Sequence, residues 1–435
     1  MTVSPTVAVA VHDGFYGCGT GAGYANFGTL GALADLLPAD VQLAVLPLRL
    51  DRSSAEHHPQ WHARARHRLR NATILPVDNG TDGQDRWGSL ENFRRLVRST
   101  ADRLRALPAE PLLIIAFDAP FLGLGSALSP ALLPHLVLAP RSSAAIHAPH
   151  DLERRAWERN GMLSAVAGGA RIATISPFMA GHLHREYGIP RQAMTALPDG
   201  LTGDDWNGYG DSADPDLPPF VFSMGRAEPY KGFEDLLAAW DLLAREGTAL
   251  PLLLIAATSE GSEPTPYQNV LRARAERLAA PVRMLTRFTP DVPRLLRHPG
   301  LRAVVVPSHA EPFGRIPMEA FAAGAAPVIT TTSQGLGGQI RDGVTGFRCE
   351  PKSPRSLALA VRRALEMSPD QRSRMRDQAR RAALRDYDHP AALRTFLTRA
   401  APWLRLRGPD HRIRLPSTAP PAADPEEVRV HRASG

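Results

Sequence analysis

Residues 302–332 constrain the fold of this chain more than any other stretch. The segment RAVVVPS is apolar and β-branched, which is typical of a short buried strand. Pro and Gly in the following HAEPFGR break that strand, and Pro317 is expected to open a helix, where its missing N–H costs nothing. The helix is expected to end at Gly324, with APVITTT as the next strand. This order predicts an α/β domain with a parallel sheet.

Two glutamates in this stretch are expected to face one crevice. Glu311 lies on the loop after the first strand, and Glu319 is expected on the first turn of the helix. Parallel sheets bind ligands outside the carboxyl ends of their strands. Carboxylates accept hydrogen bonds from sugar hydroxyls, and the backbone N–H groups of Phe313, Gly314 and Arg315 near a helix start can receive anionic oxygens. The pattern therefore predicts a site for a sugar nucleotide.

The segment EPFGRIPMEAFAAGAAPVI resembles the retaining GT-B glycosyltransferases of family four (glycosyl transferases group 1). These share Glu, seven residues and a second Glu, with Phe-Gly just after the first. The resemblance implies two Rossmann-like, doubly wound parallel-sheet domains that face a central cleft. It also implies that Glu311 contacts the donor sugar and that Glu319 contacts the ribose of the nucleotide.

The lysines are informative because the chain uses arginine almost everywhere. Only two of the 51 basic residues are lysines. Lys352 lies in the turn-like segment EPKSP, whereas Lys231 lies at a strand-to-helix turn in FSMGRAEPYKGFEDLL. A compact ammonium suits a diphosphate, and an arginine can bind phosphate with two hydrogen bonds. The resemblance implies that Arg226 and Lys231 hold the donor phosphates.

A glycine-rich turn follows the first expected strand, residues 7–13, in FYGCGTGAGYANFGTLGALADLL. A dinucleotide-binding site is the obvious alternative, but Gly23 comes one residue too early for that fingerprint. The nearest acid after the second strand, Asp51, lies about 30 residues beyond the glycines instead of about 20. The resemblance instead implies that Gly19 and Gly21 lie beside the donor phosphates.

The histidines give one candidate site residue. The family carries a histidine near the donor sugar, after a strand of its first domain, and His147 fits that place best, with His150 as the alternative. The basic stretch 57–70 contains His58 and His62 at metal-ligand spacing, but no third ligand lies nearby. We interpret that stretch as a solvated face and expect no metal site there.

Composition sets the broad class of the protein. A chain of 435 residues with 43% hydrophobic and 22% charged residues is typical of a globular protein with two domains. Two cysteines are too few for a disulfide framework, and the start of the chain reads as a strand, so we expect a cytoplasmic protein without a membrane span. The net charge of +7 reflects the arginine bias, and no nucleic-acid motif accompanies it.

The expected organisation has five parts. Residues 1–205 form an acceptor-side domain, and the Gly-, Asp- and Pro-rich residues 206–219 form a linker. Residues 220–385 form the donor-nucleotide domain, and residues 386–406 form a C-terminal helix that crosses back. Residues 407–435 are expected to be a mobile tail.

The expected reaction is transfer of a sugar from a nucleoside-diphosphate sugar, with UDP-sugars favoured, to an acceptor hydroxyl. No cofactor or metal is expected, because positive side chains and helix starts balance the diphosphate in this family. An acidic loop containing Asp78, Asp82 and Asp85 suggests a small acceptor, such as an aminocyclitol of an antibiotic pathway. The alternatives are a sugar-nucleotide epimerase, a non-catalytic sugar-nucleotide-binding subunit and a dehydrogenase. The sequence predicts no oligomeric state.

Overall fold

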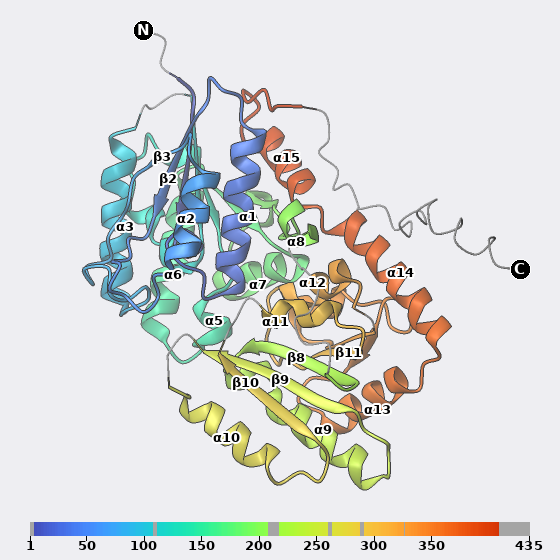
Figure 1. The fold of residues 1–435 in the computed structure, drawn as a ribbon. Coiled ribbons are helices and arrows are strands. Elements are labelled where there is room, and N and C mark those ends of the chain that lie inside the picture. Colours follow the sequence, from blue (N-terminus) through green and yellow to red (C-terminus); the bar gives the residue numbers. More distant parts are fainter. Residues whose placement is uncertain are drawn as a thin grey trace, which may run out of the picture.

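The structure is a computed structural model that describes residues 4–107, 111–207, 217–259, 263–287, 291–325 and 327–408. It contains two parallel β-sheets, one in each half of the chain, and helices pack around both (Figure 1). Much of the expected linker, residues 208–216, and most of the expected tail, residues 409–435, lie outside the described residues.

The first sheet has seven strands in the order β3-β2-β1-β4-β5-β6-β7, and every neighbouring pair is parallel. The order reverses direction between β1 and β4, which defines a switch point at the carboxyl edge of the sheet. Both of these strands are apolar and buried along their whole length, as expected for strands covered on both faces. The strands are β1 (Thr6–Val11), β2 (Gln42–Pro47), β3 (Thr73–Ile74), β4 (Leu112–Phe117), β5 (Leu136–Ala139), β6 (Arg171–Thr174) and β7 (Met194–Ala196).

The second sheet has six parallel strands in the order β10-β9-β8-β11-β12-β13. Its central neighbours β8 and β11 define a second switch point. The strands are β8 (Phe220–Arg226), β9 (Leu252–Ser259), β10 (Val282–Arg287), β11 (Leu301–Val306), β12 (Val328–Thr331) and β13 (Phe347–Cys349).

Helices connect these strands in both halves. In the first half they are α1 (Gly21–Leu36), α2 (Pro59–Arg68), α3 (Leu90–Arg105), α4 (Leu124–Ala127), α5 (Ala144–His147), α6 (Leu152–Ala167), α7 (Pro177–Tyr187) and α8 (Gly203–Asn207). In the second half they are α9 (Phe233–Arg245), α10 (Pro266–Ala275), α11 (Asp291–Arg294), α12 (Arg315–Ala323), α13 (Pro354–Leu365), α14 (Pro369–Asp386) and α15 (His389–Ala400).

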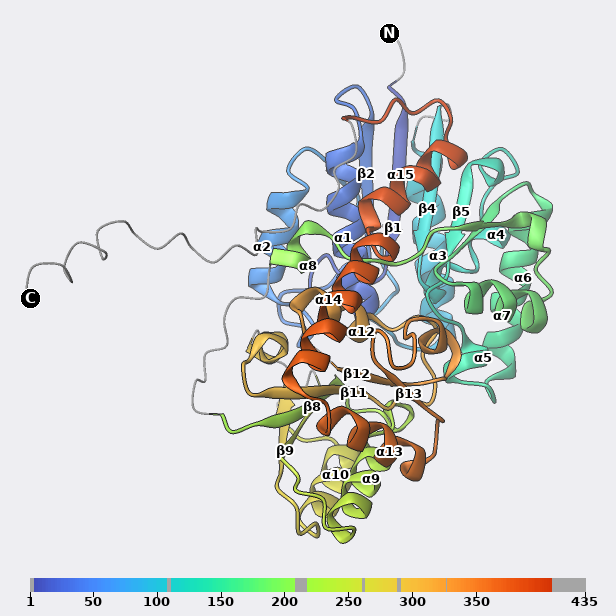
Figure 2. The same ribbon diagram turned by 90° about the vertical axis from the view of Figure 1, so that its right-hand side faces the viewer.

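The last helix returns to the first sheet. Helix α14 runs from the second half toward the first, and α15 lies beside α1 (Figures 1 and 2). Leu393, Phe396 and Leu397 of α15 are buried in the same apolar cluster as Val7 and Val9 of β1. The chain therefore crosses between the two halves twice, once after residue 200 and once before α15.

The two crossings pair with each other. The N–H of Leu201 donates to the carbonyl of Tyr387 at 2.7 Å, and the N–H of His389 donates to the carbonyl of Leu201 at 3.1 Å. Leu201 and Asp388 form an isolated parallel bridge. We call residues 199–205 and 387–389 the crossing segments. The two stretches of chain that cross between the halves are therefore bonded to each other.

Two helix boundaries differ from the expectation. Helix α12 begins at Arg315, two residues before Pro317, so Glu319 lies on the second turn and not on the first. Proline is tolerated there because the N–H groups of a helix's first turn have no intrahelical partner. The C-terminal helix expected over residues 386–406 is shorter, because Asp388 caps α15 with its side chain, Pro390 lies in its first turn and the helix ends at Ala400.

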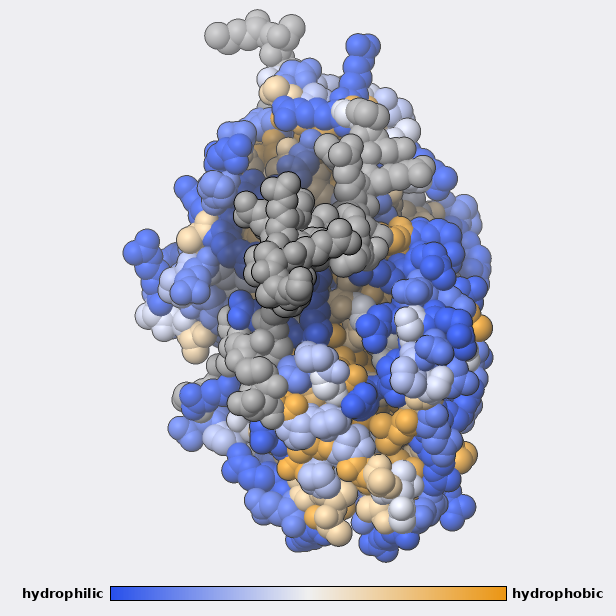
Figure 3. Space-filling view, turned by 45° about the vertical axis from the view of Figure 1, so that its right-hand side comes forward, coloured by the Kyte–Doolittle hydropathy of each residue, from blue (hydrophilic) through white to orange (hydrophobic). Residues whose placement is uncertain are grey.

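Hydrophilic side chains cover most of the face drawn in Figure 3, and the hydrophobic ones on view gather mainly in its lower part. Within the described residues, no helix combines the length and the apolar character that crossing a membrane requires.

Candidate functional site

The turn between β8 and α9 carries the two expected phosphate-binding cations. β8 ends at Arg226, and a short 3₁₀ turn, Pro229–Lys231, leads to Gly232. Gly232 has a φ of 73°, and a Cβ added there would lie 2.1 Å from the carbonyl oxygen of Pro307. Only glycine allows this close approach, which presses the lysine-bearing turn against the end of β11.

Lys231 and Glu311 meet at that contact. The Nζ atom of Lys231 donates to Oε2 of Glu311, which lies on the loop between β11 and α12. The side chains are 12% and 18% exposed, so the pair is largely desolvated but still open to a ligand. The two residues, 80 positions apart in sequence, are therefore adjacent at the switch point of the second sheet.

Arg226 and His147 converge on Tyr230. A guanidinium N–H of Arg226 donates to the Tyr230 hydroxyl at 2.5 Å, and the ring centroids of His147 and Tyr230 are 5.0 Å apart. His147 is contributed by the first half, at the end of α5, so this contact spans both halves. The structure thus brings together Arg226, Lys231, Glu311 and His147, which were expected to share one site.

Desolvation by the surrounding protein lowers the pKa of His147 to about 4, although the residue is exposed by surface area. A lowered pKa favours the neutral imidazole at pH 7. The negative charge of Glu311 opposes this shift, whereas Arg226 and Lys231 add to it. A neutral imidazole can donate one hydrogen bond and accept another, which suits a sugar hydroxyl.

A second histidine, which the sequence analysis did not select, links the two segments that carry Glu311 and Lys231. His309 Nε2 lies 2.7 Å from Oδ2 of Asp235 on α9, and the His309 backbone N–H donates to the Tyr230 carbonyl at 2.7 Å. These two bonds fix the loop that carries Glu311 to the turn that carries Lys231. The sequence could have indicated His309 only through its position, because it lies two residues before Glu311 in the same loop.

Glu319 and Arg315 form a separate pair further along α12. Arg315 Nε donates to Oε1 of Glu319 at 2.9 Å, and its two terminal nitrogens reach Oδ1 of Asp205 at 2.7 Å and the Gly200 carbonyl at 3.2 Å. Burial raises the pKa of Glu319, and the charge of Arg315 counteracts that shift. Arg315 was expected to offer only its backbone N–H, whereas its side chain joins α12 to a crossing segment.

The other expected binding residues surround this pair. Gly21 begins α1, and a Cβ there would lie 3.7 Å from Cδ of Arg315, so the glycine-rich turn of the first half faces α12. Gly19 lies two residues earlier, before the capping residue Thr20. Phe313 is buried against Tyr387 with its ring centroid 6.0 Å away, and Gly314 has a φ of 90° at the helix start.

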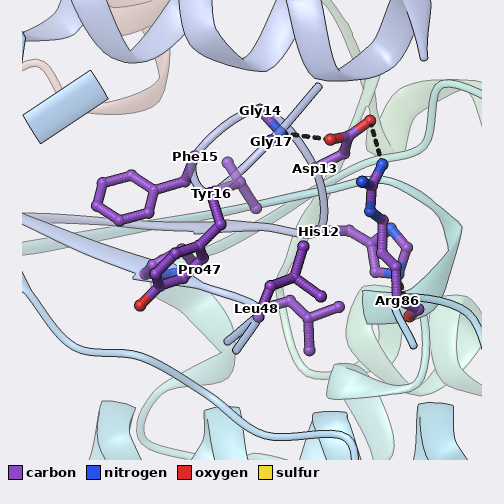
Figure 4. Close-up of a pocket in the computed structure, with 11 residues that line it drawn as sticks. His12, Asp13, Gly14, Phe15, Tyr16, Gly17, Pro47, Leu48 and Arg86 are labelled. Carbon is purple, nitrogen blue, oxygen red and sulfur yellow. Dashed lines mark hydrogen bonds and ion pairs between the residues drawn. The ribbon is translucent and has the colours of Figure 1, made fainter. Parts of the chain in front are cut away.

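The switch point of the first sheet holds a buried ionic network that sequence reasoning missed (Figure 4). Arg86 pairs with Asp13 at 2.8 Å, and Asp13 also accepts hydrogen bonds from the Gly14 N–H and the Thr20 hydroxyl, both at 2.7 Å. His12 Nε2 donates to the Arg86 carbonyl at 2.9 Å. His12, Asp13 and Arg86 line a small hollow together with Val11, Gly14, Phe15, Tyr16, Gly17, Pro47, Leu48 and Leu50.

A second part of this network surrounds Asp118 at the end of β4. Its carboxylate accepts from the Asn26 amide at 2.7 Å and faces Arg141 at 3.5 Å, while Arg141 also pairs with Asp199 at 3.1 Å. Asp118 has a φ of 78°, a conformation that costs a residue other than glycine of order 1–3 kcal/mol. All four side chains are buried.

Asp82 and Asp85 of the acidic loop are exposed, and their contact with an acceptor stays a prediction; Arg86, in the same segment, is buried. The stretch 57–70 is not solvated throughout, because Trp61 on α2 packs against Tyr24 and Phe27 at 5.1 and 4.8 Å. Within the described residues, no group of three or more His, Cys, Asp or Glu side chains is arranged to hold a metal ion.

Comparison with solved structures decides the fold. Sucrose-phosphate synthase from Thermosynechococcus elongatus superimposes with a TM-score of 0.69 over 92% of this chain and 99% of its own, at 18% identity. The Anabaena protein HepE, solved in complex with UDP and glucose, gives a TM-score of 0.68 over 92% of this chain and 100% of its own, at 17% identity. The fold is GT-B.

Sequence comparison concerns mainly the second half of this GT-B protein. Residues 210–382 match the family described as Glycosyl transferases group 1. A glycogen synthase of Mycobacterium tuberculosis is 34% identical over 175 residues, which is 39% of this chain and 39% of that protein. A D-inositol 3-phosphate glycosyltransferase of Frankia alni is 31% identical over 231 residues, 49% of this chain and 54% of its own. The chain thus aligns with between two fifths and about half of these relatives.

Proposed function

We infer that this protein is a glycosyltransferase, which moves a sugar from a nucleoside-diphosphate donor to an acceptor hydroxyl. The observation that carries this proposal is the pairing of Lys231 with Glu311 beside Arg226 and His147. The match of residues 210–382, which include Arg226, Lys231 and Glu311, to Glycosyl transferases group 1 also supports it.

The charges suit the chemistry of this transfer. As the bond between sugar and diphosphate breaks, negative charge develops on the leaving phosphate, and cations fixed in advance stabilise it most. Lys231 and Arg226 supply two such cations at one turn. Glu311 holds the Lys231 ammonium in place and offers a carboxylate to the sugar hydroxyls, and neutral His147 offers a further hydrogen bond from the first half.

The stereochemical outcome follows from the same proposal. A retaining transfer leaves the new bond in the configuration of the donor, and we propose that the acceptor hydroxyl attacks from the side that the diphosphate leaves. The leaving phosphate takes the hydroxyl proton, and no covalent intermediate with the protein forms. We further propose that no metal takes part, because the two cations fill that role.

The proposal is tested with a donor panel. UDP-glucose heads it, because HepE has been solved with UDP and glucose; other UDP-, GDP- and ADP-sugars follow, with sugars, polyols and aminocyclitols as acceptors and EDTA present. Mass spectrometry is expected to detect a glycosylated product, and NMR the donor's anomeric configuration in it. Interconversion of donors without acceptor would instead indicate an epimerase. Tight binding of nucleoside diphosphate with no turnover of any donor would indicate a non-catalytic binding subunit.

A further inference from the structure

Arg315 occupies an unusual place, because one guanidinium group contacts both halves. It extends from the first turn of α12 and is 9% exposed. On its own helix it pairs with Glu319, and across the boundary between the halves it pairs with Asp205 and binds the Gly200 carbonyl. Both partners across the boundary lie in a crossing segment.

The surroundings of this arginine come mostly from the first half. Gly21, at the start of α1, lies within van der Waals reach of its side-chain stem. A small hollow beside it is lined by Ala25, Gly28, Asp199, Gly200, Thr202, Arg315 and His389. The partner carboxylate of Asp205 is itself fixed, because it accepts from the N–H of Thr202 at 2.7 Å. The arginine is therefore anchored at its far end before it meets Glu319.

An anchored guanidinium restricts the carboxylate to which it is bonded. Glu319 has three freely rotating bonds, and burial alone favours its protonated form. The bond from Arg315 to Oε1 opposes that effect of burial and restrains the orientation of the carboxylate. Oε2, the second oxygen, then has a defined direction in which to accept hydrogen bonds. Hydrogen bonds to a charged acceptor are stronger than those between neutral groups.

We propose that Arg315 is a positioning residue for nucleotide binding, which orients Glu319 toward the ribose hydroxyls of the donor and anchors it to the crossing segment at Gly200 and Asp205. This inference rests on the proposed function, because it takes the ligand of Glu319 to be the ribose of a nucleoside diphosphate. It adds a residue whose side chain touches no substrate and acts through Glu319.

The test measures how strongly the protein prefers a ribose that carries hydroxyls. Isothermal titration calorimetry compares UDP with 2′,3′-dideoxy-UDP in the full-length protein and in Arg315→Met, which keeps the apolar stem and removes the charge. The wild-type protein is expected to bind UDP at least about 10-fold more tightly than the dideoxy analogue. Arg315→Met is expected to lose most of that ratio while its affinity for the analogue changes by less than about 3-fold.

Two further readouts separate orientation from simple loss of structure. Without its cation Glu319 has a pKa raised further by burial, so the preference of Arg315→Met for UDP over the dideoxy analogue is expected to depend on pH more than that of the wild-type protein; the ratio cancels the titration of the nucleotide's own phosphate. Arg315→Lys is expected to restore part of the ratio, since an ammonium bonds one carboxylate but lacks the guanidinium's fork. Glu319→Gln is the reference for a lost ribose contact.

The outcomes are distinguishable. If the wild-type protein prefers UDP over its analogue and Arg315→Met keeps both that ratio and its wild-type pH dependence, the role of Arg315 is wrong while the proposed function stands. If Arg315→Met does not fold, an unchanged ratio in Arg315→Lys contradicts the proposal in the same way. If the wild-type protein binds no nucleoside diphosphate from the UDP, GDP and ADP set, the proposed function fails, and this inference fails with it.

Discussion

Each of the two switch points of this molecule carries an ion pair, but the two pairs differ in how far they are exposed to solvent. In the first sheet, the ion pair of Arg86 and Asp13 is 1% and 3% exposed. In the second sheet, the pair of Lys231 and Glu311 is 12% and 18% exposed. A buried charge is costly once its partner is removed, while charges that remain accessible can exchange partners with a ligand. We propose on this basis that the charges that meet the donor phosphates come mainly from the second half, with His147 as a contribution of the first half.

The largest expected effect concerns the sealed pair. Arg86→Met leaves the Asp13 carboxylate buried without its cation, and breaking a buried pair from one side costs about 3–5 kcal/mol of unfolding free energy. Urea denaturation measures this cost. The control is Arg245→Met, which removes an exposed pair with Asp241 and should cost at most about 1 kcal/mol. Equal losses in the two variants would contradict the assigned difference between the regions.

The next effect concerns the accessible pair and falls on turnover. Lys231→Met is expected to lower donor turnover by about 10²–10³-fold, the usual cost of removing one preorganised stabilising group. The other lysine of the chain provides the control, because Lys352 lies exposed on a turn and Lys352→Met should keep full turnover. Turnover within a few-fold of wild type in Lys231→Met would remove the role proposed for this cation.

The sealed region also predicts a pH dependence. Burial and Arg86 lower the pKa of His12 to about 3, below its value of about 6.5 in the unfolded chain. The unfolded chain therefore binds the extra proton, and stability falls as the pH drops from about 6.5 toward 3. At pH 5 this amounts to about 2 kcal/mol from His12 alone. Between pH 6.5 and 5, urea denaturation should show that His12→Asn loses less unfolding free energy than the wild-type protein. An identical pH dependence in the two proteins would contradict this prediction.

The smallest expected effect concerns a hydrogen bond between the two halves of the chain. Ser176 caps α7 and also donates from its hydroxyl to the Pro312 carbonyl of the second half at 2.8 Å. Ser353 caps α13 with its side chain, and its hydroxyl makes no second bond among the described residues. Ser176→Ala should therefore destabilise the protein by about 0.5–1.5 kcal/mol more than Ser353→Ala. Equal effects would indicate that the link between the halves contributes nothing.

Much of the fold was predictable from local patterns. The segment RAVVVPS became the central strand β11, and the GT-B fold implied by EPFGRIPMEAFAAGAAPVI is confirmed. The start of α12 was placed two residues late, because a proline early in a helix does not reveal whether it stands first or third. Such patterns fix the kind of element more firmly than its ends.

The candidate site was predictable only where a motif carried it. Arg226, Lys231, Glu311 and His147 were selected from the resemblance, and they do meet around Tyr230. Asp235 and His309 were not selected from the sequence, because their contact depends on how α9 lies against the loop after β11. Arg86 and Arg141 were hidden among many arginines, since composition does not tell which of them are buried.

The central claim is that nucleotide chemistry belongs to the accessible region. Hydrogen–deuterium exchange with and without a saturating nucleoside diphosphate tests it directly, because binding slows exchange at the backbone amides that it protects. The account predicts slower exchange in peptides that cover residues 223–235 and 305–320. Protection confined to residues 12–26 and 112–120 of the first half, with none in the second, would contradict it.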